Sequence, residues 1–423
     1  MRKHIMTLAL AVLLLSSCAD VPEDVKQREA ERQNQQSAAA ADGDGERSGD
    51  LDYIPTSELG ADVEKALAGQ YRNMIISDKI RFELPEDYVK LSFTQASDYD
   101  SNAEELARKF FTYEEFSKMT FERTVEPVVT ATNDPDFDLE DQPNLITSQT
   151  YRSEEDKLHC SVWDNGFCCM IKPALFDTMG GDGRFVTIYH ADRADDLSDS
   201  YQLGDGQVTV REAVDITQKW VDDNFAYFEP EYSFRVKTVI VKKNDMDEYQ
   251  FDIRVAKAYK GIYLDELREI TDDPIPKEDG IGHYYKTKYS TNYLTFIMRT
   301  KPEPEYFTNT VGTLIPQEEG RLNEIVSLSS ALKYMENKFS DLNETLNVCD
   351  IKLKYMLTPD YDFKAGVSYD AAGTKFTAKI VWEFVIDAPP QPGSDLNDIR
   401  KYICLNAETG EMEFQFDIYQ LLQ

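Results

Sequence analysis

The sequence predicts an α+β fold of antiparallel sheets, each covered by a helix, and three observations indicate this. In the C-terminal half, apolar and polar residues alternate over several segments, as in strands with one buried face. Two other segments carry apolar residues at helical spacing and match at a fixed offset, Ala213 with Ala331. Because strands follow each helical segment, we expect a tandem of helix-plus-three- or four-strand units.

Residues 56–203 are predicted to form an N-terminal α+β domain. Helices are expected over residues 57–67 and 103–111. Strands are expected over residues 73–84 and 88–93. The clearest element is a hairpin over residues 158–171, because Asn165-Gly166 is a strong signal for a tight turn. Residues 133–141 are acidic and contain two prolines, which favours an exposed loop.

The first unit of the tandem is expected over residues 204–310. Thr209 and Glu212 have the spacing of a capping box at the start of a helix. The buried stripe of that helix is predicted to be Val210, Ala213, Val214, Thr217 and Val221. Alternation then predicts strands over residues 232–238, 249–255 and 293–298.

The second unit is expected over residues 311–423. Ser327 takes the N-cap position that Thr209 has in the first unit. The helical stripe is predicted to be Leu328, Ala331, Leu332, Met335 and Phe339. Strands are predicted over residues 351–357, 376–386, 402–406 and 412–418. Each helix has one apolar stripe and so needs one sheet to cover.

Several segments of these units resemble a PepSY-type module. They are the closing run Tyr402 to Glu411, the turn Tyr259 to Asp265, and the opening run Gly206 to Val214. The arrangement over about residues 150–423 is similar to an uncharacterised family of clostridial (Firmicutes) lipoproteins with PepSY-like repeats. This resemblance implies a fold and an envelope location. It implies no catalytic residue.

The N-terminus predicts secretion and a lipid anchor. Residues 2–4 are basic and residues 5–15 are apolar, a run too short to span a bilayer but typical of a signal peptide. Leu15-Ser16-Ser17-Cys18 resembles the bacterial lipobox. We therefore expect a signal peptide over residues 1–17, palmitate-type lipid on Cys18, and a place on the extracellular face of the cell membrane. The alternative is an ordinary signal peptide followed by a chance cysteine.

Composition predicts a tether and excludes some partners. Residues 18–55 are rich in Gln, Ala, Glu, Asp and Gly, so we expect a disordered tether with a reach of roughly 30 Å. The net charge is −33, and removal of Arg2 and Lys3 with the signal peptide makes it −35. Such a chain is not expected to bind nucleic acid or to lie on anionic lipid.

Five cysteines remain besides Cys18: Cys160, Cys168, Cys169, Cys349 and Cys404. An odd number cannot all pair within the chain, and domains of this size do not need disulfides for stability. We expect mostly buried, reduced thiols.

No motif predicts a catalytic residue, a metal ligand or a cofactor loop. The histidines lack the spacing of zinc ligands, and no nucleophile elbow or phosphate loop occurs. Residues 180–183 are predicted to form a turn. The cluster Asp192, Asp195, Asp196 and Asp199 is interpreted as a mobile acidic loop, with a calcium site as the alternative.

Trp163, beside the predicted hairpin turn, is the one candidate for ligand contact, because an indole ring at a turn stacks well on a partner. Packing against a neighbouring helix is the alternative. The predicted function is non-enzymatic binding or modulation of an unknown envelope protein or peptide. A solute- or glycan-binding lipoprotein is a second hypothesis, and a carboxylate-dependent hydrolase is a third.

Overall fold

The computed structural model describes residues 51–95, 103–127, 145–154, 157–163, 166–171, 184–244, 246–264, 267–269, 275–276, 283–284, 288–290, 294–309, 314–340, 345–359, 375–387 and 400–415. The predicted signal peptide, Cys18 and nearly all of the tether lie outside these residues. So do residues 133–141 and 180–183 and the side chain of Trp163. Within the described ranges, no helix is both long enough and apolar enough to cross a membrane.

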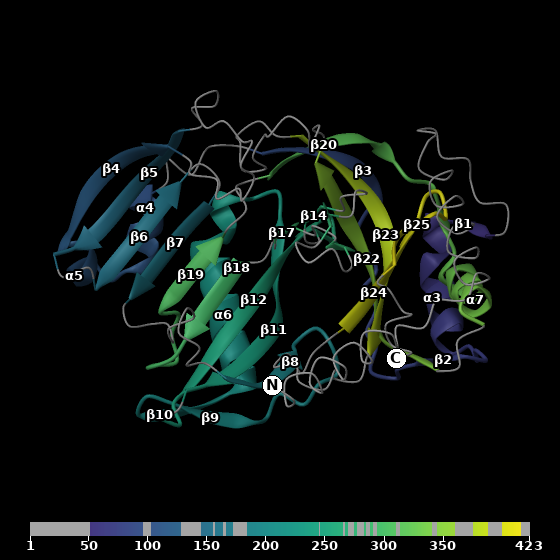
Figure 1. Ribbon diagram of the computed structural model, residues 1–423, viewed down its shortest axis with the longest axis horizontal. Coiled ribbons are helices and arrows are strands. Elements are labelled where there is room, and N and C mark those ends of the chain that lie inside the picture. Colours follow the sequence, from purple (N-terminus) through teal and green to yellow (C-terminus); the bar gives the residue numbers. More distant parts are fainter. Residues whose placement is uncertain are drawn as a thin grey trace, which may run out of the picture. The chain divides into compact units, whose positions relative to one another are not determined.

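The predicted α+β class is confirmed, and strands dominate (Figure 1). The N-terminal elements are β1 Tyr53–Pro55, η1 Thr56–Glu58, α3 Leu59–Leu67, β2 Met74–Ile76, β3 Val89–Gln95, α4 Ala103–Phe110, α5 Tyr113–Phe116, β4 Met119–Pro127, β5 Leu145–Ser153, β6 Leu158–Trp163, β7 Gly166–Ile171, β8 Arg184–His190, β9 Ser200–Leu203 and β10 Gly206–Thr209. The strand predicted over residues 73–84 is wrong beyond β2. The chain turns after Ser77, whose carbonyl accepts a bond from the amide of Ile80.

The C-terminal elements include both predicted helices. They are α6 Val210–Asn224, η4 Ala226–Phe228, β11 Ser233–Lys243, β12 Tyr249–Tyr259, β13 Ile262–Leu264, β14 Leu267–Glu269, β15 Ile275–Pro276, β16 His283–Tyr284, β17 Lys288–Ser290, β18 Leu294–Met298, β19 Tyr306–Asn309, β20 Leu314–Arg321, β21 Glu324–Val326, α7 Leu328–Lys338, β22 Leu346–Pro359, β23 Lys375–Asp387, β24 Arg400–Asn406 and β25 Met412–Gln415.

Strands β11, β12, β18 and β19 pair antiparallel in that order and are called the first meander. Strand β8 extends it beyond β11, and β7, β6, β5 and β4 extend it beyond β19. Helix α6 packs on β11 and β12, and its predicted stripe is buried. The predicted capping box is present, with Thr209 and Glu212 as its two members. The first helix therefore covers its sheet as expected.

Strands β22, β23, β24 and β25 also pair antiparallel in chain order and are called the second meander. Helix α7 begins at the predicted N-cap Ser327, whose hydroxyl accepts a bond from the amide of Ser330. Its stripe is buried, and it packs beside α3 (Figure 1). Trp382 of β23 donates a hydrogen bond to the carbonyl of Val326, next to the start of α7. Both regions thus repeat the order helix and four strands.

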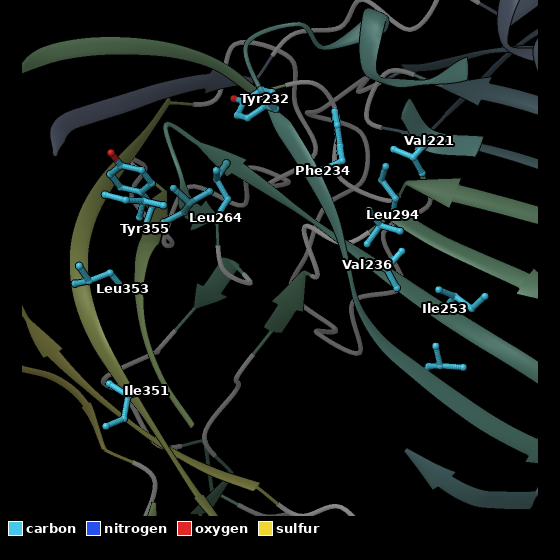
Figure 2. Packing of buried hydrophobic residues seen from close by; sticks show 14 of the residues in the cluster. Val221, Tyr232, Phe234, Val236, Ile253, Leu264, Leu294, Ile351, Leu353 and Tyr355 are labelled. Atoms are coloured by element: carbon cyan, nitrogen blue, oxygen red, sulfur yellow. The ribbon is translucent and has the colours of Figure 1, made fainter. Parts of the chain in front are cut away.

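A short strand joins the two meanders. Strand β12 turns into β13 through Lys260 and Gly261, which both have positive φ (48° and 82°), as a two-residue turn of type I′ requires. Strand β13 then pairs in parallel with β22, so that Leu264 meets Tyr355. Figure 2 shows these two side chains next to each other, between the buried residues of the two meanders.

A register irregularity interrupts the first strand of each meander. In β11 it lies between Val236 and Thr238, and in β22 between Val348 and Asp350. The residues left over are Lys237 and Cys349. A bulge of this kind turns a side chain away from the regular alternation. Lys237 is accordingly buried beside the buried Val236.

The cysteines follow the sequence prediction only in part. Cys160 and Cys169 form a disulfide, because β6 and β7 place them directly opposite each other. The prediction of a reduced thiol was wrong for these two. It holds for Cys168, Cys349 and Cys404. The predicted hairpin is confirmed, because β6 and β7 pair antiparallel and Trp163 lies opposite Gly166.

Candidate binding site

A cavity of about 120 Å³ lies between the two meanders. Strands β8, β11 and β12 and the turn after β8 line one side, and β22, β23 and β24 line the other. Strand β13 contributes Tyr263 and Leu264. A smaller cavity of about 20 Å³ adjoins it and shares Asp192, Lys237 and Lys352. Nearly all of these side chains come from paired strands, so the walls are held by backbone ladders.

Asp192 is the centre of the charged lining. Its Oδ2 atom accepts hydrogen bonds from Nζ of Lys237 at 2.9 Å and from Nζ of Lys352 at 2.6 Å. Lys352 also contacts Asp350 at 2.7 Å, and Asp350 contacts Arg193 at 3.0 Å. These five side chains form one connected network, which we call the Asp192 network. Four of them are at most 10% exposed, and Lys352 is 21% exposed.

Further lining residues add charge and an aromatic ring. Lys354 binds Glu383 at 2.6 Å, and both side chains are buried. Nζ of Lys237 lies 3.3 Å from the centroid of the Tyr263 ring, a cation–π contact in a desolvated place. The Tyr263 hydroxyl donates to Glu83 at 3.2 Å. Burial raises the pKa of Tyr263, and the neighbouring Glu83 carboxylate raises it further.

The network holds its members in different protonation states. Burial alone raises the pKa of Asp192, but Lys352 and Lys237 outweigh it, and the net pKa lies well below its usual range. Burial lowers the pKa of Lys237 to about 7, and the positive charge of Lys352 acts in the same direction. Burial lowers the pKa of Lys352 too, yet Asp192 and Asp350 outweigh it and the net shift is upward. The network has three cations and two carboxylates, so its charges are not fully compensated.

The four carboxylates of the aspartate cluster do not converge, and the mobility of their loop stays a prediction. Asp192 belongs to the network, and Asp195 accepts a bond from the backbone amide of His190. Asp196 accepts from the amide of Ser198, and Asp199 accepts from the hydroxyl of Tyr189. The calcium alternative has no support in this geometry. Among all described residues, no group of three His, Cys, Asp or Glu side chains has a metal-binding arrangement.

Trp163 is the last residue of β6 and pairs with Ser148 and Gly166. It belongs to the hairpin of β6 and β7. Its predicted role in ligand contact stays a prediction. Sequence reasoning missed Lys237 and Lys352, since lysine in alternating strands normally faces solvent, and it missed Arg193, which lies in the turn after β8.

Two solved structures are similar to this chain. An uncharacterized protein from Eubacterium rectale ATCC 33656 has a TM-score of 0.49 and 14% sequence identity, covering 84% of this chain and 99% of its own. The YpeB C-terminal domain of Bacillus megaterium has a TM-score of 0.25 and 11% identity, covering 76% of this chain and 97% of its own. No family model and no curated protein matches the sequence.

Proposed function

We propose that this protein is a lipoprotein, anchored through Cys18 on the extracellular face of the cell membrane, that binds a protein or peptide partner without catalysing a reaction. The units over residues 204–310 and 311–423 act as PepSY-like modules in this proposal. The observation that carries it is the cavity between the two meanders, whose charged walls come from paired strands and are fixed before a ligand arrives. A fixed wall lowers the entropy lost on binding.

The ion pairs of the cavity's carboxylates support binding over acid catalysis by these groups. Asp192, Asp350 and Glu383 are each held by cationic side chains in ion pairs. A carboxylate with a pKa held low, as Asp192 has, is a poor general acid at neutral pH.

The anchor is tested by metabolic labelling. Radiolabelled palmitate is expected to enter the wild type and not Cys18→Ala, because the lipid is attached through the thiol. Cys349→Ala serves as the control, because it removes a different reduced thiol and leaves the lipobox unchanged. Label in the Cys18→Ala chain would exclude this anchor.

Binding is tested with the mature chain as bait. A partner captured from the envelope should bind again when both proteins are pure, and Trp163→Ala should weaken that binding if the hairpin takes part. Tyr113→Ala is the matched control, because Tyr113 is an exposed aromatic residue at 85% exposure on a different element. In parallel, peptide, ester and glycan libraries are assayed for turnover. Turnover that one carboxylate substitution abolishes would replace the binding proposal with the hydrolase hypothesis.

A further inference from the structure

Among the described residues, the lining of the cavity has more positive than negative charge. Its cationic side chains are Arg193, Lys237, Arg254, Lys352 and Lys354. The carboxylates that line or contact it are Asp192, Asp350 and Glu383. With every group ionised, five cations face three carboxylates, an excess of two positive charges. The whole chain has the opposite balance, with a net charge of −33. The positive excess is therefore a local feature of this cavity.

Arg254 is the cation that the protein does not neutralise. It stands on β12 between Ile253 and Val255, is half-buried, and lines the cavity. In the described part of the chain its guanidinium has no hydrogen bond and no ion pair. A guanidinium presents a planar fork of donors that matches a carboxylate or phosphate group.

Arg193 has a similar unmet donor on the same wall. Its side chain is 8% exposed, and its Nη2 atom binds Asp350. Its Nε atom is buried and has no hydrogen-bond partner. A buried donor without a partner costs roughly 1–3 kcal/mol, so native proteins rarely leave one without a reason.

From these observations we propose that the cavity between the meanders is a binding site for an oxyanion, meaning a carboxylate or phosphate group. Arg254 is its main ligand-binding residue, and Arg193, Lys237 and Lys354 add charge around it. This inference rests on the proposed binding function and names the chemistry of the ligand at the same cavity. The negative charge of the ligand offsets the cation excess that the three carboxylates leave.

The size of the cavity agrees with such a ligand. The cavity of about 120 Å³ is several times the roughly 10–15 Å³ that one enclosed water molecule needs. A single phosphate or carboxylate group fits in this volume. The group is either free in solution or carried by a larger partner that remains outside the cavity.

Isothermal titration calorimetry on the chain from residue 18 with Cys18→Ser tests the site. Inorganic phosphate, acetate and succinate are titrated separately at constant ionic strength in chloride. We expect saturable binding of at least one oxyanion, and about tenfold or more weaker binding for Arg254→Gln. Arg254→Lys keeps the positive charge and should lie between the two. Arg321→Gln is the matched control, because Arg321 is an exposed strand arginine at 72% exposure.

Each outcome decides the proposal. Binding of phosphate alone assigns a phosphate site, and binding of acetate or succinate assigns a carboxylate site. Failure of every oxyanion to bind, or equal binding by Arg254→Gln when circular dichroism shows it folded, would refute the inference. Capture of a partner without oxyanion binding would leave the proposed function intact and remove only this site. Oxyanion binding without capture of any partner would support this site and contradict the proposed partner binding.

Discussion

Two buried lysines on neighbouring strands of the first meander differ in how their charges are compensated. Lys257 on β12 binds Glu229, which follows η4, at 2.7 Å, and the two side chains are 2% and 0% exposed. Lys237 on β11 shares the carboxylate of Asp192 with Lys352. The first arrangement has one charge of each sign. The second belongs to a network with a positive excess beside a cavity.

The difference separates a balanced ion pair from the wall of a candidate binding site. A balanced pair in a closed interior has no charge left for a ligand, and removing one partner leaves an uncompensated buried charge. A network with excess positive charge beside a cavity still attracts an anion from solution. The three predictions below test this distinction, from the largest expected effect to the smallest.

Lys257→Met is expected to lower the free energy of unfolding by about 3–5 kcal/mol, because it leaves Glu229 charged and buried. The double variant Lys257→Met/Glu229→Leu should recover most of this loss, since an apolar pair needs no compensation. Urea unfolding followed by circular dichroism measures both. A single variant as stable as the wild type would mean that this pair is not the closed interior site described here.

The stability that depends on Lys237 should rise with pH. Its pKa is about 7 when folded and near 10.5 when unfolded, so the unfolded chain binds more protons between these values. Stability therefore increases over this range, and the cost of the buried charge is fully present below pH 7. Between pH 7 and pH 9, the wild type should gain about 2 kcal/mol relative to Lys237→Met. Urea unfolding at the two pH values measures it, and a constant difference would contradict the shift.

At pH 7, Lys237→Met should leave the free energy of unfolding unchanged or raise it by about 1 kcal/mol, because it removes the cost of a buried charge. Asp192 keeps Lys352 at 2.6 Å, and the change removes one cation from a network that has too many. The comparison with Lys257→Met in the same denaturant series is the measurement. Equal losses for the two variants would erase the distinction between the two regions.

Much of the fold could be predicted from the sequence, because local signals and tertiary packing agree in it. The stripes of α6 and α7, the caps at Thr209 and Ser327, and the long alternating strands all follow from periodicity. The strand predicted over residues 73–84 was too long. The short strand β2 is set by its parallel pairing with β22, and no local sequence pattern reveals that pairing.

Less of the candidate binding site could be predicted from the sequence. Lys352 and Lys354 alternate with Ile351 and Leu353, so they were assigned to a solvated face. In the structure this face lies across the cavity from strands of the first meander, and so it is not open to solvent as the alternation predicts. Lys237 reaches its place through a bulge, and sequence alternation has no signal for one extra residue. The sequence shows the acidic cluster after β8, but the cationic partners of Asp192 lie in distant segments of the chain.

The parallel pairing of β13 with β22 has a consequence for how the chain acquires its structure. Tyr355, which pairs with Leu264, emerges much later during synthesis. Contacts between distant parts of a chain slow folding, because the intervening loop must close first. Either meander alone would also lack one wall of the cavity that both share. The two meanders are therefore expected to melt in one cooperative transition, and neither half is expected to fold stably on its own.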